Sequence, residues 1–383
     1  MRVLILNTDY EAFLEDFYAQ NPGLAEASYA QQMAARNRSL FGAADFYSQG
    51  FKVNGVEAAE VHLNNRAMQL RWGAEQGLNV CTIAEPKAQG LSATLRRMFK
   101  QRNLSPQLAA MPEWMRAIMI AQIEAFRPDV ILNHVMHFVS ADSLRSLVGK
   151  RCLLVGQIAA PWHEPEDDAG YDLIVTSLPN FVRRFERRGI RAFYNQLGFA
   201  PEVLTIVPES RERDIAVSFV GSLSSHHADR ISLLEYLAER TELNVWGMGI
   251  DEVSRHSPIR ACHRGQAWGR DMFAIFRRSK IVINQHIGIA GLFANNMRLY
   301  EATGCGAALV TDRKTNLHEL FEVGSEIVDY GDPADCLARI EEMLDDPARR
   351  AEVGRKGQER TCRGHTYVQR TAELKLKFAE LLN

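Results

Sequence analysis

The sequence of 383 residues lacks several features that would place a protein in a class at once. No run of 18 apolar residues occurs, so we expect no transmembrane helix. The 45 basic and 47 acidic side chains nearly cancel, and the formal charge of −2 does not give the positive field of a general nucleic-acid binder. Only six cysteines are present, none in a CxxC pair, which argues against a disulfide framework or a zinc site and favours free thiols in the cytoplasm.

The first residues also lack the pattern of a signal peptide. Their apolar run, at 1–6, is short and soon broken by Asn7 and Asp9, and it is typical of a first core strand. With 46% hydrophobic and 24% charged residues the composition is globular, which excludes a disordered or fibrous chain. At about 100–200 residues per domain, the length predicts two or three domains.

Short apolar runs alternate with helical periods along the chain. Several runs are continuously apolar, as in strands buried on both faces, which indicates parallel sheets covered by helices. The predicted fold class is therefore α/β, built from repeated strand–helix units. We expect strands at residues 3–6, 79–83, 130–133, 152–157, 173–176, 217–220, 244–246, 281–284, 308–311 and 326–329.

A change of pattern near residue 200 predicts a domain boundary. We expect an N-terminal domain at 1–200, a C-terminal domain at 201–365 and a final amphipathic helix at 366–383. The first domain would carry a helical insertion at about 13–55, where strand signals are few and aromatic residues many. These aromatics also fit the cores of ordinary helices. Near the end of the chain, Asp332-Pro333 and Asp346-Pro347 each place an N-cap acid before an N1 proline, which predicts two helix starts.

The strand predicted at 217–220 leads into a turn rich in glycine and serine, and then into a helix. Gly221 permits a ligand to approach the backbone, and the amides at the helix start favour an anion. Ser222 and His226 belong to the same turn, and Arg230 offers a charged fork to a phosphate. The turn is neither a Walker loop nor a GxGxxG motif, so alone it is a weak signal, and the alternative is a plain strand–turn–helix corner.

A second constellation, at residues 295–306, leads into another predicted strand. Asn295 or Asn296 caps its short helix, whose amides and positive dipole end suit a diphosphate. Arg298 and Glu301 share one face of this helix, and Glu301 is placed to accept hydrogen bonds from ribose hydroxyls. The alternative is a surface ion pair between these two side chains.

Two histidines of the first half follow predicted strands, whose carboxyl ends line the ligand crevice of a parallel sheet. His134 is placed to touch a sugar hydroxyl, with His137 as its alternative. His163 or Glu164 is a candidate general base, and Trp162 between them and the strand offers a stacking face. The competing interpretations are a structural, hydrogen-bonded histidine in the first case and a packed turn in the second.

The succession of strand, glycine-bearing loop, short helix with an interior glutamate, small residues with glycine, and strand resembles the nucleotide-sugar half of GT-B glycosyltransferases. Among these it resembles the CgeB-like, spore-maturation-protein type of the glycosyl transferases group 1 family. The resemblance covers residues 215–370, and the first half only by its domain pattern. The residues that carry it are Asn296, Arg298, Tyr300, Glu301, Gly304-Cys305-Gly306, Leu309-Val310-Thr311-Asp312, Leu317, Glu319-Leu320-Phe321, Gly324 and His365-Thr366-Tyr367.

This resemblance implies two Rossmann-like domains that face each other across a cleft, with the last helix crossing back to the N-terminal domain. The N-terminal domain would bind the acceptor, and the C-terminal domain would bind a nucleotide diphosphate sugar. The loops of Gly247 and His263 would approach the base, although both also fit ordinary loops. The donor residues implied are Gly221, Ser222, His226, Arg230, Gly247, His263, Asn296, Arg298 and Glu301.

One residue departs from the family's pattern. Retaining GT-B enzymes often carry Glu-x7-Glu, with the first acid near the donor sugar and the second on the ribose. Glu301 fills the second position, but Phe293 stands in the first. The ribose role therefore carries over to this sequence and the role of the sugar-binding acid does not.

The predicted function is that of a cytoplasmic, hexosyltransferase-like glycosyltransferase that needs no metal and no cofactor. His134 and His163 would handle the proton, and the acidic run at 166–168 would be a solvated loop. The acceptor is left open among glycan, lipid-linked and protein classes. A basic amphipathic stretch at 91–102 fits a helix docked on its own domain, or weak contact with a membrane. The alternatives are a non-catalytic nucleotide-sugar or glycan-binding protein, which Phe293 favours, and a nucleotide-sugar isomerase.

Overall fold

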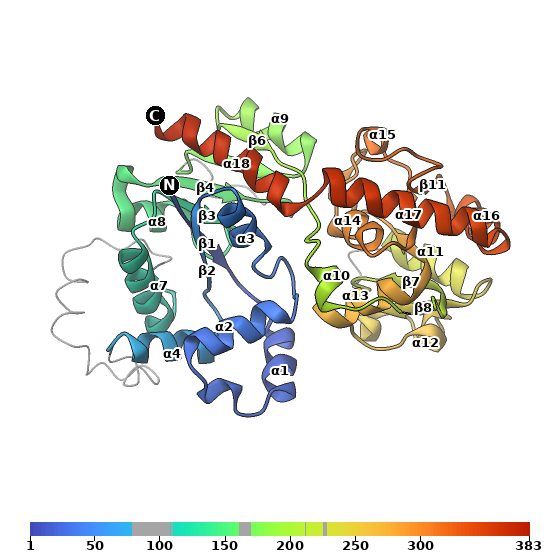
Figure 1. The fold of residues 1–383 in the computed structure, drawn as a ribbon, viewed down its shortest axis with the longest axis horizontal. Helices are drawn as coiled ribbons and strands as arrows, with labels where there is room; N and C mark the ends of the chain where they lie inside the picture. The colour runs from blue at the N-terminus through green and yellow to red at the C-terminus, as the bar shows by residue number, and fades with distance from the viewer. Residues whose placement is uncertain (79–107, 109, 161–169, 211, 225–227) are drawn as a thin grey trace. The chain divides into compact units, whose positions relative to one another are not determined.

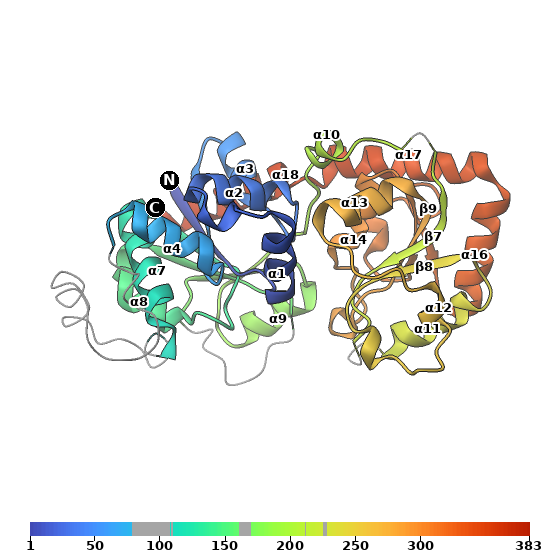
Figure 2. The same cartoon turned by 90° about the horizontal axis from the view of Figure 1, so that it is seen from below.

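The computed structural model describes residues 1–78, 108, 110–160, 170–210, 212–224 and 228–383. They divide into two compact units, each built on a parallel β-sheet (Figures 1 and 2). The first unit comprises Met1–Asn195 and Thr371–Asn383, and the second comprises Gln196–Arg370. The predicted α/β class with two parallel-sheet domains is confirmed.

The sheet of the first unit has the strand order β2-β1-β3-β4-β5-β6, and all described pairs are parallel. Its central strands are continuously apolar and fully buried, as expected for a sheet with helices on both faces. The strands are β1 (Arg2–Asn7), β2 (Glu57–His62), β3 (Val130–Asn133), β4 (Leu153–Gln157), β5 (Leu173–Thr176) and β6 (Ala192–Tyr194).

The segment between β1 and β2 is helical, as the prediction for about 13–55 has it. Its aromatic side chains pack on one another: the ring of Phe13 stacks on Phe17 and on Phe41. They therefore fill a core, which is the plainer of the two interpretations of this stretch. The helices of the segment are α1 (Glu11–Gln20), η1 (Leu24–Glu26), α2 (Tyr29–Arg38) and α3 (Phe46–Val53).

The remaining helices of the first unit follow strands or close the unit. Helix α18 (Tyr367–Leu382) groups with this unit from Thr371 onward, and its Phe378 stacks on Phe51 of α3, with 6.0 Å between the ring centroids. The others are α4 (Arg66–Glu75), α7 (Glu113–Phe126), α8 (Ala141–Val148), η3 (Gly149–Arg151) and α9 (Pro179–Arg187).

The sheet of the second unit has the order β11-β10-β9-β7-β8, again with parallel pairs. Its apolar strands pack with the buried faces of the helices into one core. The strands are β7 (Ile215–Val220), β8 (Leu243–Trp246), β9 (Ser279–Asn284), β10 (Ala308–Asp312) and β11 (Val328–Tyr330).

Helices α14 and α17 lie side by side in the second unit (Figures 1 and 2). The two helix starts predicted from Asp-Pro pairs are confirmed, because Asp332 accepts from the amide of Asp335 and Asp346 from that of Arg349, each at 2.9 Å. The helices are α10 (Val203–Ile206), α11 (Ala228–Ala238), η5 (Ile250–Glu252), α12 (Ile259–Cys262), α13 (Gly269–Arg278), η6 (Gly288–Ala290), α14 (Met297–Gly304), α15 (Leu317–Leu320), α16 (Pro333–Asp345) and α17 (Pro347–Gly364).

Two strands escaped the sequence-based prediction. Strand β2 has the sequence EAAEVH, whose glutamates and alanines are poor strand formers. Strand β6 is a short edge strand, and its residues are only partly buried. The predicted strand at 79–83 lies outside the described residues, and β11 spans Val328–Tyr330 rather than 326–329. Across the described ranges no helix is long and apolar enough to cross a membrane.

Candidate active site

Two glycine loops pack back to back at the carboxyl ends of β7 and β8. The amide of Gly221 donates to Trp246 O at 2.9 Å, and a Cβ added to Gly247 would lie 1.8 Å from Gly221 O. A Cβ on Gly221 itself would lie 2.9 Å from the ring of Phe219. The space beside these two glycines is therefore filled by the protein itself, namely by the neighbouring loop and by the ring of Phe219.

Arg230 ties the loops that follow two adjacent strands. Its guanidinium donates to Ser222 O after β7 and to Gln285 O after β9, each at 3.0 Å. Burial, together with the charge of Arg298, lowers the pKa of Arg230 to about 10. The side chain of Arg230 remains a cation at neutral pH, and repulsion from the Arg298 cation makes this charged form less favourable.

Arg298 and Glu301 form an ion pair within α14. The Arg298 Nε also donates to Val220 O at 2.9 Å, which fixes the guanidinium at the carboxyl end of β7. The Glu301 side chain is only 4% exposed and that of Arg298 28%. The ion pair named as the alternative to ribose binding is thus present, but it is largely buried rather than on the surface.

Asn296, and not Asn295, is the N-cap of α14. Its Oδ1 accepts from the amide of Leu299 at 3.2 Å, and its Nδ2 donates to Asn284 Oδ1 at 2.7 Å. The Asn284 amide in turn donates to Thr311 Oγ1 at 2.9 Å. These bonds join the start of α14 to the ends of β9 and β10, where the carboxyl edge of a parallel sheet binds ligands.

His263 is held in the loop beside β8. Its Nε2 lies 3.0 Å from Gly247 O, and the residue pairs with Val245 in an isolated parallel bridge. The structure thus brings together at one sheet edge the predicted Gly221, Ser222, Arg230, Gly247, His263, Asn296, Arg298 and Glu301. Outside the described residues lie the predicted His163 and His226, the alternative base Glu164, the stacking residue Trp162, the acidic run at 166–168 and the basic stretch at 91–102.

A dyad at the same edge was not predicted from the sequence. The His286 backbone amide donates to Asp312 Oδ1 at 3.0 Å and its Nδ1 lies 2.6 Å from that oxygen, while Lys314 Nζ lies 3.1 Å from Oδ2. Burial alone would raise the pKa of Asp312, but His286 and Lys314 lower it below its ordinary range. Both residues of the dyad follow predicted strands, so the strand-end rule applied to His134 would have found them.

His134 follows β3 directly, and its amide continues the ladder by donating to Leu6 O at 3.1 Å. Its Nδ1 lies 2.9 Å from Asn7 Oδ1, and its ring meets Tyr47 edge-on, with 4.9 Å between the centroids. Burial lowers the pKa of His134 to about 4, so the imidazole is neutral at pH 7. The alternative, His137, is exposed.

Four buried ionisable side chains beside His134 also went unpredicted. Arg36 and Asp9 lie 2.5 Å apart, and the other oxygen of Asp9 lies 3.3 Å from His62 Nδ1. Burial alone would raise the pKa of Asp9, but His62 and Arg36 hold it well below its usual range. Burial raises the pKa of the fourth group, Glu60, to about 7. Two of these groups, Glu60 and His62, lie on β2, a strand that its sequence does not predict.

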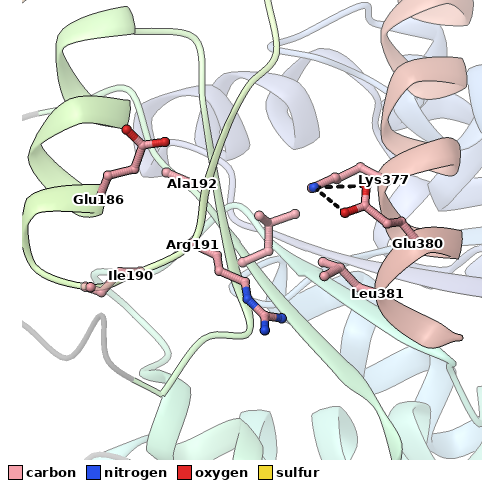
Figure 3. A pocket seen from close by; sticks show the side chains of 9 residues that line it. Glu186, Ile190, Arg191, Ala192, Lys377, Glu380 and Leu381 are labelled. Atoms are coloured by element: carbon pink, nitrogen blue, oxygen red, sulfur yellow. Dashed lines mark hydrogen bonds and ion pairs between the residues drawn. The ribbon is translucent and has the colours of Figure 1, made fainter.

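A pocket of about 700 Å³ opens elsewhere in the first unit, between α9, the start of β6 and α18 (Figure 3). It is lined by the first residues of β5 and β6, Leu173 and Ala192, and so lies at the opposite edge of the sheet from His134. Lys377 and Glu380 form an ion pair in its wall at 2.9 Å. Over the described ranges, no three His, Cys, Asp or Glu residues gather as a group able to hold a metal.

The comparisons with known proteins agree with this architecture. Residues 230–375 match the family described as "Glycosyl transferase-like". HepE of Anabaena, solved in complex with UDP-glucose, has a TM-score of 0.59 at 13% identity, over 99% of this chain and 100% of that one. Sucrose-phosphate synthase of Thermosynechococcus elongatus has a TM-score of 0.58 at 11% identity, over 100% and 99%.

A third solved structure, AviGT4, a glycosyltransferase involved in avilamycin A biosynthesis, has a TM-score of 0.56 at 14% identity, over 100% of this chain and 98% of that one. No curated protein matches the chain in sequence. At such identities the structural likeness establishes the fold and nothing finer, so the CgeB-like subtype stays a prediction. The chain has the GT-B fold, and its residues 230–375 match the family described as "Glycosyl transferase-like".

Proposed function

We propose that the protein transfers a hexose from a nucleotide diphosphate sugar to an acceptor hydroxyl. The observation that carries the proposal is the pair of guanidiniums of Arg230 and Arg298 beside the capped start of α14. They lie at the carboxyl edge of a parallel sheet, within the glycosyl transferase-like segment. Anions bind at such places because amides, helix dipole and guanidiniums all favour negative charge.

The diphosphate would bind between the two arginines. Each carries a positive charge, and each lowers the energy of an anion that both can reach. Burial and, to a lesser extent, repulsion from Arg298 lower the pKa of Arg230, and a bound anion would offset both effects. As the leaving diphosphate gains charge in the transition state, the same groups would stabilise it. This supply of positive charge supports the proposal that transfer needs no metal ion.

The ribose would bind at Glu301. Its Oε2 pairs with Arg298, but each carboxylate oxygen has more than one acceptor site, so the ion pair is compatible with hydrogen bonds from ribose hydroxyls. Arg298 would then act twice, as a phosphate ligand and as the group that orients Glu301.

The acceptor would bind to the first unit, at the edge that holds His134. A neutral imidazole accepts hydrogen bonds, and either His134 or His163 would take the proton of the acceptor hydroxyl. The acceptor is a glycan, a lipid-linked sugar or a protein, and the basic stretch at 91–102 favours an anionic one. The five described cysteines are free, which supports the proposed cytoplasmic location.

The proposal is tested first by binding. HepE was solved with UDP-glucose and with UDP, so the first ligands in a thermal-shift screen are UDP and UDP-glucose, followed by the other nucleoside diphosphates. A ligand at 100 times its dissociation constant stabilises the protein by about 2.7 kcal/mol. The matched variants are Arg230→Met, in the site, and Arg278→Met, at an exposed ion pair with Asp214.

Turnover is tested next. Release of nucleoside diphosphate that requires an acceptor supports transfer. Binding without any release would favour the non-catalytic alternative, and conversion of the sugar nucleotide without acceptor would favour the isomerase. If no nucleoside diphosphate stabilises the protein, or if Arg278→Met abolishes the stabilisation as fully as Arg230→Met, the donor site is wrong.

A further inference from the structure

Polar side chains meet at the carboxyl ends of four adjacent strands in the first unit. In the sheet order β2-β1-β3-β4, the chain places His62, Asn7, His134 and Gln157 at or directly after the last strand residues. The register pairs Asn7 with His62 and Leu6 with Asn133, so these side chains lie at one level of the sheet.

One chain of hydrogen bonds runs through this group. His134 Nδ1 lies 2.9 Å from Asn7 Oδ1, and Asn7 Nδ2 donates to Glu60 Oε2 at 2.9 Å. The other oxygen, Glu60 Oε1, accepts from the Ser48 amide at 3.1 Å. An ionised carboxylate only accepts hydrogen bonds, so it fixes which end of the Asn7 amide faces it. The Asn7 oxygen is then left to face His134.

This order determines the tautomer of His134. Because an amide oxygen has no proton to give, the nitrogen that faces it must carry the hydrogen. The proton therefore sits on Nδ1, and Nε2 keeps its lone pair. We propose that Glu60 and Asn7 are positioning residues, which hold His134 in the Nδ1–H tautomer so that its Nε2 accepts a hydrogen bond from a sugar or acceptor hydroxyl. The tautomer is a property of the protein alone, whereas its use towards a hydroxyl rests on the proposed function.

The opposite tautomer, with the proton on Nε2, also has an acceptor close by, so the hydrogen bond to Asn7 is what selects between the two tautomers. The side chain of Gln157 lies against the His134 ring, and it raises the pKa of His134 against the larger effect of burial, which lowers it. Within the described part of the chain, neither His134 Nε2 nor Gln157 Oε1 forms a hydrogen bond of good geometry, and both atoms are buried. Gln157 Nε2 donates to the Tyr47 hydroxyl at 3.0 Å, which leaves the amide oxygen for other use. A proton on Nε2 would be attracted to that oxygen. The free imidazole side chain also prefers the proton on Nε2, so without Asn7 the Nε2–H form would win.

Glu60 makes the arrangement depend on pH. The groups that face it are Asn7 on β1, the Ser48 amide on α3, and His62 on its own strand, 3.9 Å away; Arg36 on α2 favours its charge and Asp45 opposes it. Burial raises the pKa of Glu60 to about 7. Above that pH the carboxylate orders Asn7. Below it, a protonated Glu60 can donate to Asn7 Oδ1, the amide can turn, and His134 loses its constraint while staying neutral down to pH about 4.

The test reads the tautomer directly. Protein labelled with ¹⁵N-histidine is measured by NMR at pH 8.5, without ligand, and the His134 signals are assigned by their loss in His134→Gln. We expect a protonated Nδ1 and an unprotonated Nε2 in the native sequence. In Glu60→Gln, which keeps the size of the side chain, and in Asn7→Leu, we expect the proton to redistribute towards Nε2. The matched control is Glu57→Gln, at the exposed start of the same strand, which should leave the tautomer unchanged.

The His62 signal shows whether each variant retains the fold, and Asn7→Leu substitutes for Glu60→Gln if the latter does not fold. A protonated Nε2 in the native sequence overturns the proposal. So does a Nδ1–H signature that survives in folded Asn7→Leu. When the pH is lowered from 8.5 to 6, the Nδ1–H signature of His134 should weaken. A signature that stays constant would show that Glu60 does not control the tautomer.

The activity arm is separate. If the proposed function holds, Glu60→Gln lowers kcat at least tenfold and leaves the affinity for nucleoside diphosphate unchanged, whereas Glu57→Gln changes neither. A correct tautomer in a protein without transferase activity would refute the proposed function and leave the positioning role standing. If the protein is an active transferase but His134 carries its proton on Nε2, the positioning role is refuted and the proposed function stands.

Discussion

Glu301→Gln separates the structural role of Glu301 from its proposed role in donor binding. The change removes the negative charge but keeps an oxygen of similar position. Removing one partner of a buried ion pair costs about 3–5 kcal/mol. The Arg298 side chain is 28% exposed and keeps its hydrogen bond to Val220 O, so we expect a cost at the low end of this range, about 3 kcal/mol.

A surface pair of the same spacing provides the control. Glu352 and Arg355 are also three residues apart on a helix, but their side chains are 47% and 53% exposed. Exposed pairs contribute about 0–1 kcal/mol because water screens them. Glu352→Gln should therefore cost well under 1 kcal/mol, and the difference between the two variants measures the effect of burial.

The assay is amide hydrogen exchange in urea, followed for peptides of α14 and β10, because two units need not unfold together. Equal costs for Glu301→Gln and Glu352→Gln would refute the reasoning from burial. Affinity for UDP is measured on the same samples. If Glu301 binds ribose, affinity falls by about 1.5–3 kcal/mol, or roughly 10- to 150-fold. Loss of stability with unchanged affinity would leave Glu301 a structural residue only.

The remaining predictions concern the two proposed half-sites. His134→Ala and His163→Ala should leave the affinity for nucleoside diphosphate unchanged and lower turnover, by about 10²–10⁴-fold for the one that acts as base; if neither moves the rate tenfold, the base lies elsewhere. Activity should survive excess EDTA, and its loss with recovery in manganese or magnesium would reject the proposed donor site. Asp312→Asn should release the His286 ring, which Asp312 now holds, and lower kcat/KM at least tenfold; a rate within threefold of the native one would exclude the dyad from the reaction.

Strands buried on both faces were the most predictable part of the fold. Val130, Ile131 and Leu132 are fully buried, and their apolar run is visible in the sequence. Strand β2 was not predictable in this way, because Glu60 and His62 are polar and are buried only through partners that come from distant segments. Such pairing depends on the tertiary fold and leaves no local pattern.

The candidate site likewise combines features that the local sequence predicts with features that depend on the tertiary fold. The position of His134 after a strand followed from the sequence, since the strand itself was evident. Its partner Asn7 lies 127 positions away, and nothing local in either segment indicates that they meet. The spacing of Arg298 and Glu301 was also evident, but their burial depends on how α14 packs against β9 and β10, which the spacing does not encode.

The first unit is assembled from two separate stretches of chain, and this fixes an order of events during synthesis. Residues 196–370, the whole of the second unit, leave the ribosome before Thr371–Asn383, which the first unit still needs. Leu374 and Phe378 of that late segment are fully buried in the finished protein. The second unit can therefore fold while the first unit still lacks its last segment and the apolar surface around Phe51 is exposed. We expect chaperones to bind the nascent chain at the exposed apolar surface of the first unit, because that unit is synthesised before the second but completed after it.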